Sequence, residues 1–576
     1  MTNVQDQLDP DPYLQKGVIF PRLTPEMILR ASAYGTEEIV PEGAWLFERG
    51  DRNVDFFVVL EGEMEVLSLD RNSENTLLTT VDEGQFTGEL DLFNARANLV
   101  NGRAAVNSLV LRIRRPEFRR LITCESDIGE VVMKAFILRR IGSIQHGQGG
   151  VILIGSTHAG DTIRIQRFLV RNGYPHRLID TDREETADDL LAYYDLNGSL
   201  LPAIVLPDRS VLHVPSNAEV ADALGLTEHV DPSHIYDVAV VGAGPAGLAT
   251  AVYAASEGLS TIVVEGVAPG GQAGTSSKIE NYLGFPTGIS GQDLASRAQL
   301  QAQKFGARLA VSRAAEKLDC SQHPYQLRLE DDQRIMAKSI VIATGARYRK
   351  LSLANYGRFE NQGIYYAATA MEAALCAGEE VIVVGGGNSA GQAAVFLSRA
   401  VSHLHLLIRG AGLAATMSDY LVQRILSSHK ITLHVHTEIT ELEGDEFLHA
   451  VTWTDRRTGN AERRPVANVF VMTGAQPNSE WLSGWVDMDA RGFIRTGADM
   501  AGSKPGSPYS TALPGVFAVG DVRSGSVKRI TSAVGEGSVV VAAIHEYLAS
   551  YDVTAYSHPG DPSKRVSAER GATLTS

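Results

Sequence analysis

Cysteine, long apolar runs and an excess of positive charge are scarce in this 576-residue chain. Its three cysteines, Cys124, Cys320 and Cys376, lie far apart and form neither a Cys-x-x-Cys motif nor a metal-ligand spacing, so we predict no metal site. No run of about 18 apolar residues occurs, which argues against a membrane span. Acidic residues outnumber basic ones, 68 to 52, and the net charge of −16 argues against nucleic acid or an anionic membrane surface as a partner.

The start of the chain and its composition are those of a globular protein. Residues 1–12 are polar and acidic, without a signal-peptide pattern, so we expect a cytoplasmic location. Hydrophobic residues make up 44% and charged residues 21%, which is ordinary for globular domains. At roughly 100–200 residues per domain, the length predicts several domains.

A Gly-x-Gly-x-x-Gly motif follows a short run of valine and alanine. Gly242, Gly244 and Gly247 have the spacing at which a buried strand turns into a helix while its backbone passes close to a diphosphate. The next apolar run ends in Glu265, 18 residues after the third glycine, where a carboxylate can accept hydrogen bonds from a ribose. This stretch predicts a dinucleotide site.

The motif recurs in the second half of the chain as Gly385, Gly387 and Ala390. Here the second strand ends in Arg409, and a guanidinium suits the 2′-phosphate of NADPH better than the free hydroxyl of NADH. There are thus two dinucleotide folds in tandem. The second strand of the first fold ends in an acidic residue, and that of the second fold ends in an arginine. This combination predicts a flavin that exchanges electrons with a nicotinamide. We prefer NADPH and leave NADH open.

Short alternating runs between glycine turns predict a small β-barrel or jelly roll with helices in residues 1–145. Residues 86–90 read Phe-Thr-Gly-Glu-Leu and resemble the cyclic nucleotide-binding domain. The resemblance implies a nucleotide pocket at Gly88, Glu89 and Leu90. In that family an arginine pairs with the phosphate, but Asn98 and Leu99 stand at its positions. A cyclic nucleotide, another ligand and a purely structural role therefore stay open.

Residues 151–228 alternate strands and helices in an order that resembles the thioredoxin or glutaredoxin fold, with Pro202 opening a late strand. The turn at 156–161, where that fold has its redox motif, contains no cysteine, and without a thiolate there is no disulfide exchange. We interpret this segment as a scaffold or interface domain. A ligand site beside Pro202 is the alternative.

The remainder of the chain, from 236 to about 548, resembles low-molecular-weight thioredoxin reductase. The matching stretches beyond the two glycine motifs are 269–272, 279–282, 343–346, 473–475, 519–521 and 530–533. The resemblance implies FAD and NADPH (or NADH) as cofactors, a homodimer, and a rotating NAD(P)H domain with hinges near 356–363 and 473–478. The FAD-binding residues it implies, beside the first motif and Glu265, are Gly271, Gln272, Asn281, Thr344, Gly345, Gly520, Asp521, Arg529 and Ile530.

The predicted fold class is α/β multidomain: an N-terminal β-barrel (jelly roll) with helices, a thioredoxin-like α/β domain, and two Rossmann-like domains for FAD and NAD(P)H. The predicted domains are 1–145, 151–228, 235–349 for FAD, 350–475 for NAD(P)H, 476–555 for FAD again, and a disordered tail at 556–576.

One feature of that reductase family is missing. Its Cys-Ala-Thr-Cys-Asp strip aligns with residues 367–371, where both cysteines are replaced, by Ala367 and Ala370, and the acid by Met371. Glu372 sits one residue on, about 100° around a helix. Cys376 is a single thiol that could close a disulfide only with a partner's thiol, and we interpret it as a core residue.

The sequence thus predicts an FAD-dependent NAD(P)H oxidoreductase without a protein dithiol. Its acceptor would be a small redox protein, a quinone, oxygen or a bound disulfide. A cation at Lys528 or Arg529, before the helix at Ile530, would stabilise reduced flavin, or the two form a solvated pair. One alternative is a pseudoenzyme that signals redox state or nucleotide occupancy through the N-terminal modules. Another is a thioredoxin-disulfide reductase that uses Cys376.

Overall fold

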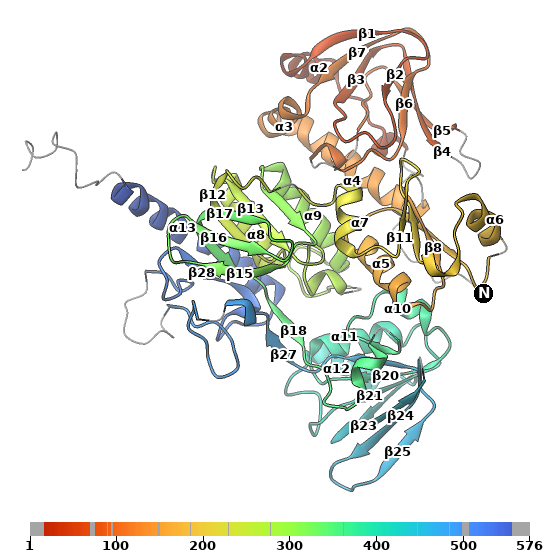
Figure 1. Cartoon of the computed structure of the whole chain (residues 1–576), viewed down its shortest axis with the longest axis vertical. Coiled ribbons are helices and arrows are strands. Elements are labelled where there is room, and N and C mark those ends of the chain that lie inside the picture. The colour runs from red at the N-terminus through yellow and green to blue at the C-terminus, as the bar shows by residue number, and fades with distance from the viewer. Residues whose placement is uncertain are drawn as a thin grey trace, which may run out of the picture.

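The computed structural model has four modules (Figure 1). It describes residues 16–555 with gaps at 70–74, 89, 94–95, 147–149, 185, 229, 277, 361, 446, 483 and 498–505. The predicted tail at 556–576 lies outside the described residues. We name the modules the N-terminal module (16–146), the middle module (151–228), the first α/β domain (235–348 with 475–555) and the second α/β domain (349–474).

The N-terminal module is a sandwich of two antiparallel sheets with the orders β1-β7-β3 and β2-β6-β4-β5. Both sheets contribute to one apolar core, in which Phe57, Met64 and Val110 are buried. The predicted sheet-rich region is confirmed, whereas a closed barrel is absent from the described residues, because the two sheets stay separate. Its elements are α1 Lys16–Ile19, α2 Pro25–Ala31, β1 Thr36–Val40, β2 Trp45–Phe47, β3 Phe56–Glu61, β4 Glu63–Leu69, β5 Asn75–Asp82, β6 Asn101–Ala104, β7 Ser108–Ile113, α3 Arg115–Cys124 and α4 Ser126–His146.

The middle module has a mixed sheet with the order β11-β10-β8-β9, in which β8 is parallel to β9 and antiparallel to β10. The Leu201-Pro202 peptide bond before β10 is cis. Assignment to the thioredoxin fold stays a prediction. The elements are β8 Val151–Gly155, α5 Gly160–Arg171, β9 His176–Asp180, α6 Thr186–Tyr193, β10 Ala203–Val205, β11 Val211–His213 and α7 Asn217–Leu224.

The first α/β domain has a sheet in which β14, β13, β12, β17 and β28 run parallel and β16 and β15 extend the other edge antiparallel. Residues 238–241 of β12 are all apolar and buried, as expected of a strand covered on both faces. The elements are β12 Ile235–Val241, α8 Pro245–Ser256, β13 Thr261–Glu265, α9 Gly291–Lys304, β14 Arg308–Val311, β15 Ala315–Asp319, β16 Tyr325–Leu329, β17 Arg334–Ile342, β28 Val516–Ala518 and α13 Ile530–Ala555.

The second α/β domain contains a five-stranded parallel sheet, β19-β26-β20-β21-β22, and an antiparallel sheet, β23-β24-β25. The elements are β19 Ile364–Tyr365, α10 Ala370–Leu375, β20 Glu380–Val384, α11 Asn388–Leu397, β21 His403–Leu407, α12 Asp419–Leu426, β22 Ile431–His434, β23 Thr437–Gly444, β24 Leu448–Asp455, β25 Ala461–Arg464 and β26 Asn468–Val471.

The chain crosses between the two α/β domains through a two-stranded antiparallel link, β18 (Ala346–Tyr348) with β27 (Ala475–Pro477). β27 lies within the predicted hinge at 473–478. In the other predicted hinge, 356–363, Tyr356 and Phe359 are buried in a core of the second α/β domain. The first crossing is therefore at β18.

The middle module is attached to both of its neighbours. Arg52 of the N-terminal module donates a hydrogen bond to the carbonyl oxygen of Ala223, 2.8 Å away, and Arg313 of the first α/β domain forms an ion pair with Asp222 at 2.7 Å. Figure 1 shows α5 between α9 and α10, which belong to different α/β domains. In the described part of the chain, no helix is both long and apolar enough to cross a membrane.

Candidate functional site

The turn after β12 needs glycine at two positions for close packing and leaves the third exposed to a ligand. Gly242 has a φ of +106°, and a Cβ there would lie 2.4 Å from the carbonyl oxygen of Ala343. At position 247 a Cβ would lie 1.8 Å from the carbonyl oxygen of Gly242. A Cβ at Gly244 would meet nothing within 4 Å. The turn is therefore locked at its ends and open in the middle, as diphosphate binding requires.

Glu265 ends β13 directly beside this turn. One carboxylate oxygen accepts a hydrogen bond from the backbone N–H of Ala243 at 2.8 Å, and the other accepts from Val267 at 3.0 Å. These two bonds hold the carboxylate next to Gly244, at the position where a ribose would follow the diphosphate.

Other predicted residues converge on the same turn from three separate segments. A Cβ at Gly271 would lie 3.1 Å from the Cα of Gly244, and one at Gly520 would lie 2.9 Å from the Cβ of Ala246. Thr344 also lies against the turn, because a Cβ at Gly242 would be 3.0 Å from its Cα. These residues line a cradle that larger side chains would fill.

The cradle is braced where the chain leaves and re-enters the first α/β domain. The Thr344 hydroxyl donates to the carbonyl oxygen of Asn478 at 2.7 Å, and the Asn478 amide donates back to the carbonyl oxygen of Thr344 at 2.9 Å. Asn478 N–H also donates to Gly345 at 3.0 Å, and the Gln272 amide donates to the carbonyl oxygen of Ala346. Asn281, in contrast, is an exposed turn residue.

The start of α13 carries the predicted cations. Lys528 Nζ donates to the carbonyl oxygen of Asp521 at 3.2 Å and lies 4.6 Å from the centre of the Phe493 ring. Burial raises the pKa of the Asp521 carboxyl, although the Lys528 charge opposes that shift. Arg529 is exposed, one residue before the helix begins at Ile530. Lys528 is exposed as well, but its contacts with Asp521 and Phe493 fix the position of its charge.

These observations fit FAD. A cradle without side chains at Gly244, a helix N-terminus at Pro245 and a carboxylate at Glu265 match a diphosphate followed by a ribose.

The turn after β20 has the same construction. Gly385 has a φ of +143°, and a Cβ there would lie 2.3 Å from the carbonyl oxygen of Met472. Around Gly387 the nearest atom to a Cβ would be 4.0 Å away, which leaves the middle of this turn open as well. The third position, Ala390, is buried in the core of the second α/β domain.

The segment after β21 lies along this second turn. A Cβ at Gly386 would be 3.6 Å from Ile408, and the Thr416 hydroxyl donates to the carbonyl oxygen of Gly386 at 2.6 Å. Asn388 accepts a hydrogen bond from the Ser418 N–H at 2.7 Å and so holds the loop. Arg409 follows Ile408 directly and is exposed, at the place where a 2′-phosphate could approach.

A small cleft of about 30 Å³ is lined by residues of both α/β domains. Gln272 of the first α/β domain and Ser389 of α11 both line it, so residues near each turn meet there. Ala367, the first of the two alanines predicted to stand at the reductases' cysteine positions, is also in this lining, whereas Ala370 is exposed at the start of α10. No cysteine is among the described residues of the cleft, which are Gln272, Thr275, Ser276, Lys278, Tyr348, Tyr366, Ala367, Ala368, Ser389, Gln392, Ala393 and Met472.

Glu372 points to the middle module. Its side chain, 3% exposed, forms an ion pair with Arg167 of α5 at 3.0 Å and accepts a hydrogen bond from the Thr369 N–H at 3.0 Å. The Arg167 guanidinium also lies 5.3 Å from the centre of the Tyr365 ring. This carboxylate is thus committed to an interdomain contact.

Cys376 is buried, and its thiol donates to the carbonyl oxygen of Glu372 at 3.1 Å. Burial raises the pKa of the Cys376 thiol to about 12. The residue packs with the apolar core of the second α/β domain, as the sequence predicted.

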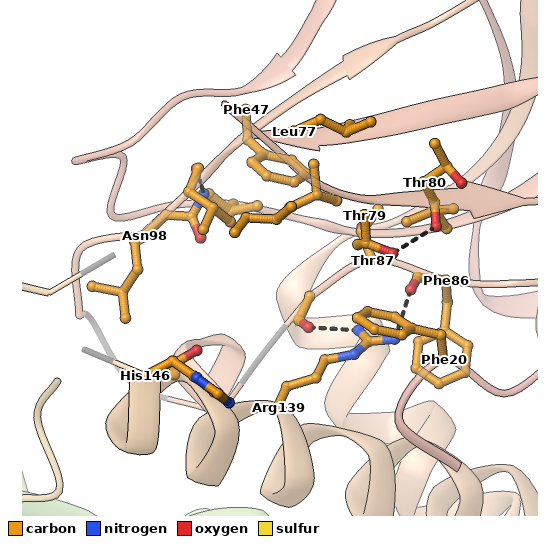
Figure 2. A pocket seen from close by; sticks show the side chains of 18 residues that line it. Phe20, Phe47, Leu77, Thr79, Thr80, Phe86, Thr87, Asn98, Arg139 and His146 are labelled. Carbon is orange, nitrogen blue, oxygen red and sulfur yellow. Dashed lines mark hydrogen bonds between the residues drawn. The ribbon is translucent and has the colours of Figure 1, made fainter. Parts of the chain in front are cut away.

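The N-terminal module encloses a separate cavity of about 610 Å³ (Figure 2). Apolar residues such as Phe47 and Leu77 dominate its lining, and Arg139 of α4 lies at its edge. The Arg139 guanidinium donates to the carbonyl oxygens of Gly88 at 2.8 Å and Phe86 at 3.1 Å, as Figure 2 shows. The helix thereby holds the turn that resembles a nucleotide-binding loop.

Of the predicted pocket residues, Gly88 lines this cavity. The backbone of Leu90 begins a short 3-10 helix, and Glu89 lies outside the described residues. Asn98 and Leu99, which are predicted to stand at the positions of the phosphate-binding arginine, are part of the wall. Thr87, 2% exposed, also lines the cavity, and its hydroxyl has no hydrogen-bond partner in the described structure.

Two dinucleotide-type domains that meet at a shared cleft define a flavin- and nicotinamide-dependent oxidoreductase. Residues 236–537 match the model of the pyridine nucleotide-disulphide oxidoreductase family, and the chain belongs to that family. Residues 37–123 match the cyclic nucleotide-binding domain. The chain is an FAD-dependent NAD(P)H oxidoreductase of the thioredoxin reductase-like type, whose members bind FAD and NADPH.

Relatives and solved structures agree with that family. The thioredoxin reductase of Mycoplasmopsis pulmonis is 32% identical over 307 residues, 53% of this chain and 95% of that protein. NADPH-dependent thioredoxin reductase 3 of Arabidopsis thaliana is 32% identical over 333 residues, and the match spans 56% of this chain and 60% of that protein. The thioredoxin reductase structure from Lactococcus lactis, in its FR conformation, has 29% identity and a TM-score of 0.51 over 55% of this chain and 99% of its own.

Two residues near the candidate site were not found by sequence reasoning. Arg167 and Arg171 are both on α5 of the middle module, and their partners Glu372 and Gly271 lie 205 and 100 residues away. Two arginines four residues apart on a helix are the only signal, and this spacing does not indicate which domain they contact.

Proposed function

We propose that this protein transfers electrons from NAD(P)H through FAD to an acceptor without a protein dithiol. The observation that carries the proposal is the cleft lined by both α/β domains, which includes Ala367 at a position where the related reductases have a cysteine. A methyl group can neither attack a disulfide nor store electrons. The acceptor therefore has to take electrons directly from the cofactor.

When bound, FAD and NAD(P)H supply the hydride-transfer chemistry. The residues of the chain bind and orient them. The 242–247 turn and Glu265 would hold the adenosine diphosphate part of FAD, and the 385–390 turn with Arg409 would hold NADPH. Lys528, which contacts Asp521 and Phe493, would place a positive charge near the N-terminus of α13. This charge would stabilise the negative charge of the reduced flavin.

Four acceptor classes agree with this arrangement. A small redox protein, a quinone, oxygen and a disulfide brought by a partner can each accept electrons without a thiol from this chain. The polar groups around the cleft, including Gln272, Lys278 and Tyr366, favour an acceptor that makes hydrogen bonds.

An anaerobic titration of the holoenzyme with NADPH and then with NADH tests the proposal. We expect loss of the oxidised flavin absorbance band within seconds, followed by reoxidation with at least one acceptor from a panel of the four classes. A protein that binds NADPH but keeps the flavin band would contradict it. Such a result would favour a pseudoenzyme that reports nucleotide occupancy.

The Arg409→Gln variant tests whether the protein prefers NADPH to NADH, and Arg399→Gln is its control. Removal of a charge-assisted contact with the 2′-phosphate should raise the NADPH concentration needed for half-maximal reduction by about 10-fold, with little change for NADH. Arg399→Gln, a charge change elsewhere in the same domain, should alter neither. Equal effects of Arg409→Gln on both nucleotides would show that Arg409 does not read the 2′-phosphate.

We also infer that the N-terminal module is a ligand-responsive input to the flavoprotein half. The loop that contributes Asn98 to the cavity wall also contains Arg96, which is 8% exposed. Arg96 donates to the carbonyl oxygen of Asn172, the C-cap residue of α5, at 3.3 Å. A ligand that moves this loop would therefore move α5.

Titration of the full chain with cAMP, cGMP and their linear nucleotides tests this second function. We expect a ligand to bind and to change the rate of flavin reduction, and Arg96→Gln to preserve binding while reducing that change. Binding without any change in the reduction rate would limit the module to a docking or structural role.

A further inference from the structure

The C-terminal end of α5 belongs to the middle module but is anchored on the first α/β domain. The Gln292 amide of α9 donates to the carbonyl oxygen of Arg171 at 2.9 Å. Beside it, the Asn172 amide donates to the carbonyl oxygen of Val267 at 3.5 Å. Two contacts thus hold the last turn of the helix against the segments that follow β13 and begin α9.

This anchoring directs the Arg171 side chain towards the Gly244 turn. Its Nη2 donates to the carbonyl oxygen of Gly271 at 3.2 Å, and the Gly271 residue packs against Gly244. In the described part of the chain this is the one hydrogen bond of the guanidinium, which has five N–H groups. Burial lowers the pKa of Arg171, and the nearby Glu265 carboxylate partly offsets that shift.

The negative charge that gathers at the 242–247 turn when FAD is bound would be stabilised by a cation. Residues 242–246 are uncharged, Glu265 is an acid, and the diphosphate of FAD brings further negative charge to the same place. Backbone N–H groups and the N-terminus of α8 supply only partial positive charge. A partly buried guanidinium, with four N–H groups that have no partner among the described residues, supplies a full charge there and can make charge-assisted hydrogen bonds.

From this geometry we propose that Arg171 is an FAD-binding residue, so that the middle module contributes part of the flavin site by contacting the diphosphate-ribose end. The proposal rests on the placement of FAD at the 242–247 turn. It gives a function to a module that lacks the thioredoxin cysteines: the module closes the flavin site from outside the two α/β domains.

FAD rebinding to the full-length apoprotein tests the proposal, with flavin fluorescence as the readout. Arg171→Gln should raise the Kd for FAD by about 10- to 100-fold, and Arg171→Lys should restore part of that loss because it keeps the charge. Riboflavin, which lacks the diphosphate and adenosine, is the second probe. Its Kd should be the same for both variants and the wild type.

Arg164→Gln is the matched control, because Arg164 is on the same helix but contacts Asp161 and Asn217 of the middle module itself. It should leave the Kd for FAD within about 2-fold of wild type. Binding of NADPH to the second α/β domain, measured by calorimetry, reports whether each variant is folded.

Three results have distinct meanings. If wild-type apoprotein fails to bind FAD, the proposed function is wrong. If wild type binds FAD and Arg171→Gln binds it equally well, only the role of Arg171 is wrong. If Arg171→Gln weakens riboflavin as much as FAD, Arg171 shapes the fold rather than binding the diphosphate, and the inference is overturned.

Discussion

At the residue scale, the surroundings of Cys376 decide whether a thiol route to substrate exists. The side chain is buried, and burial raises the pKa of the thiol to about 12. At neutral pH it is therefore a protonated thiol in an apolar core, whereas the thiolate is the form that attacks a disulfide. Cys124, which is exposed, is far from this site in the chain.

We predict that Cys376→Ser leaves the rate of flavin reduction and of turnover within about 2-fold of wild type, since the thiol has no role in electron transfer. Iodoacetamide at pH 8 should modify Cys124 and leave Cys376 intact in the folded protein, which peptide mass spectrometry will show. Loss of turnover in Cys376→Ser, with the fold preserved, would support the thioredoxin-disulfide reductase alternative.

At the scale of elements, two histidines on neighbouring strands make the second α/β domain sensitive to acid. His405 of β21 and His434 of β22 are linked by their ring nitrogens at 3.1 Å and pack against Trp453 of β24. Burial lowers the pKa of both rings. His403 and Arg464 also lower the pKa of His405, whereas Glu380 opposes that shift.

The sign of the pH effect follows from these shifts. Both histidines have pKa values in the folded state below about 6.5, their ordinary value. Their contribution to stability is therefore present above pH about 6.5 and is lost as the pH falls through the folded-state values.

We predict that His405→Gln reduces the acid sensitivity of thermal unfolding, because Gln keeps polarity but does not titrate. The difference in melting temperature between pH 7.5 and 5.5 should be smaller by a few degrees than in wild type, as calorimetry can measure. His213→Gln, at an exposed position of β11, is the control and should behave as wild type. An unchanged difference in His405→Gln would place the acid sensitivity elsewhere.

At the scale of the whole molecule, the second α/β domain is connected to the first by the two short strands β18 and β27. Ion pairs also link it to the first α/β domain and to the middle module. Arg424 of α12 pairs with Glu280 of the first α/β domain at 2.6 Å, and Arg167 of α5 pairs with Glu372. Rotation of this domain about β18 and β27 would have to break both pairs. The middle module therefore opposes that rotation.

We predict that Arg167→Met destabilises the protein by about 3 kcal/mol, since it leaves the Glu372 carboxylate buried without its cation. Adding Glu372→Gln should recover part of that loss, because the buried charge is removed. Urea unfolding of both single variants and the double variant measures the coupling. The exposed pair Arg347 and Glu480 is the control, and its Arg347→Met variant should cost less than about 1 kcal/mol. Strictly additive losses for Arg167 and Glu372 would show that the pair does not hold the domain.

Local patterns in the sequence predict much of this architecture. The two glycine turns, the strands that precede them and the acid at Glu265 follow from short-range spacing, because a dinucleotide turn is built from neighbouring residues. The absence of a Cys-x-x-Cys motif is likewise evident from the sequence.

Tertiary structure alone decided how these parts are combined. Nothing in the local sequence places Arg171 beside Gly271, Arg167 on Glu372, or Arg96 on Asn172, because these contacts depend on how whole modules dock. The separation of the N-terminal strands into two sheets was also undetermined, since strand pairing across a sandwich depends on long-range register. The sequence by itself determined two dinucleotide folds and the absence of a Cys-x-x-Cys motif, through residues that act with their neighbours. The docking of the middle module on both α/β domains was decided by side chains that meet only after each module has folded.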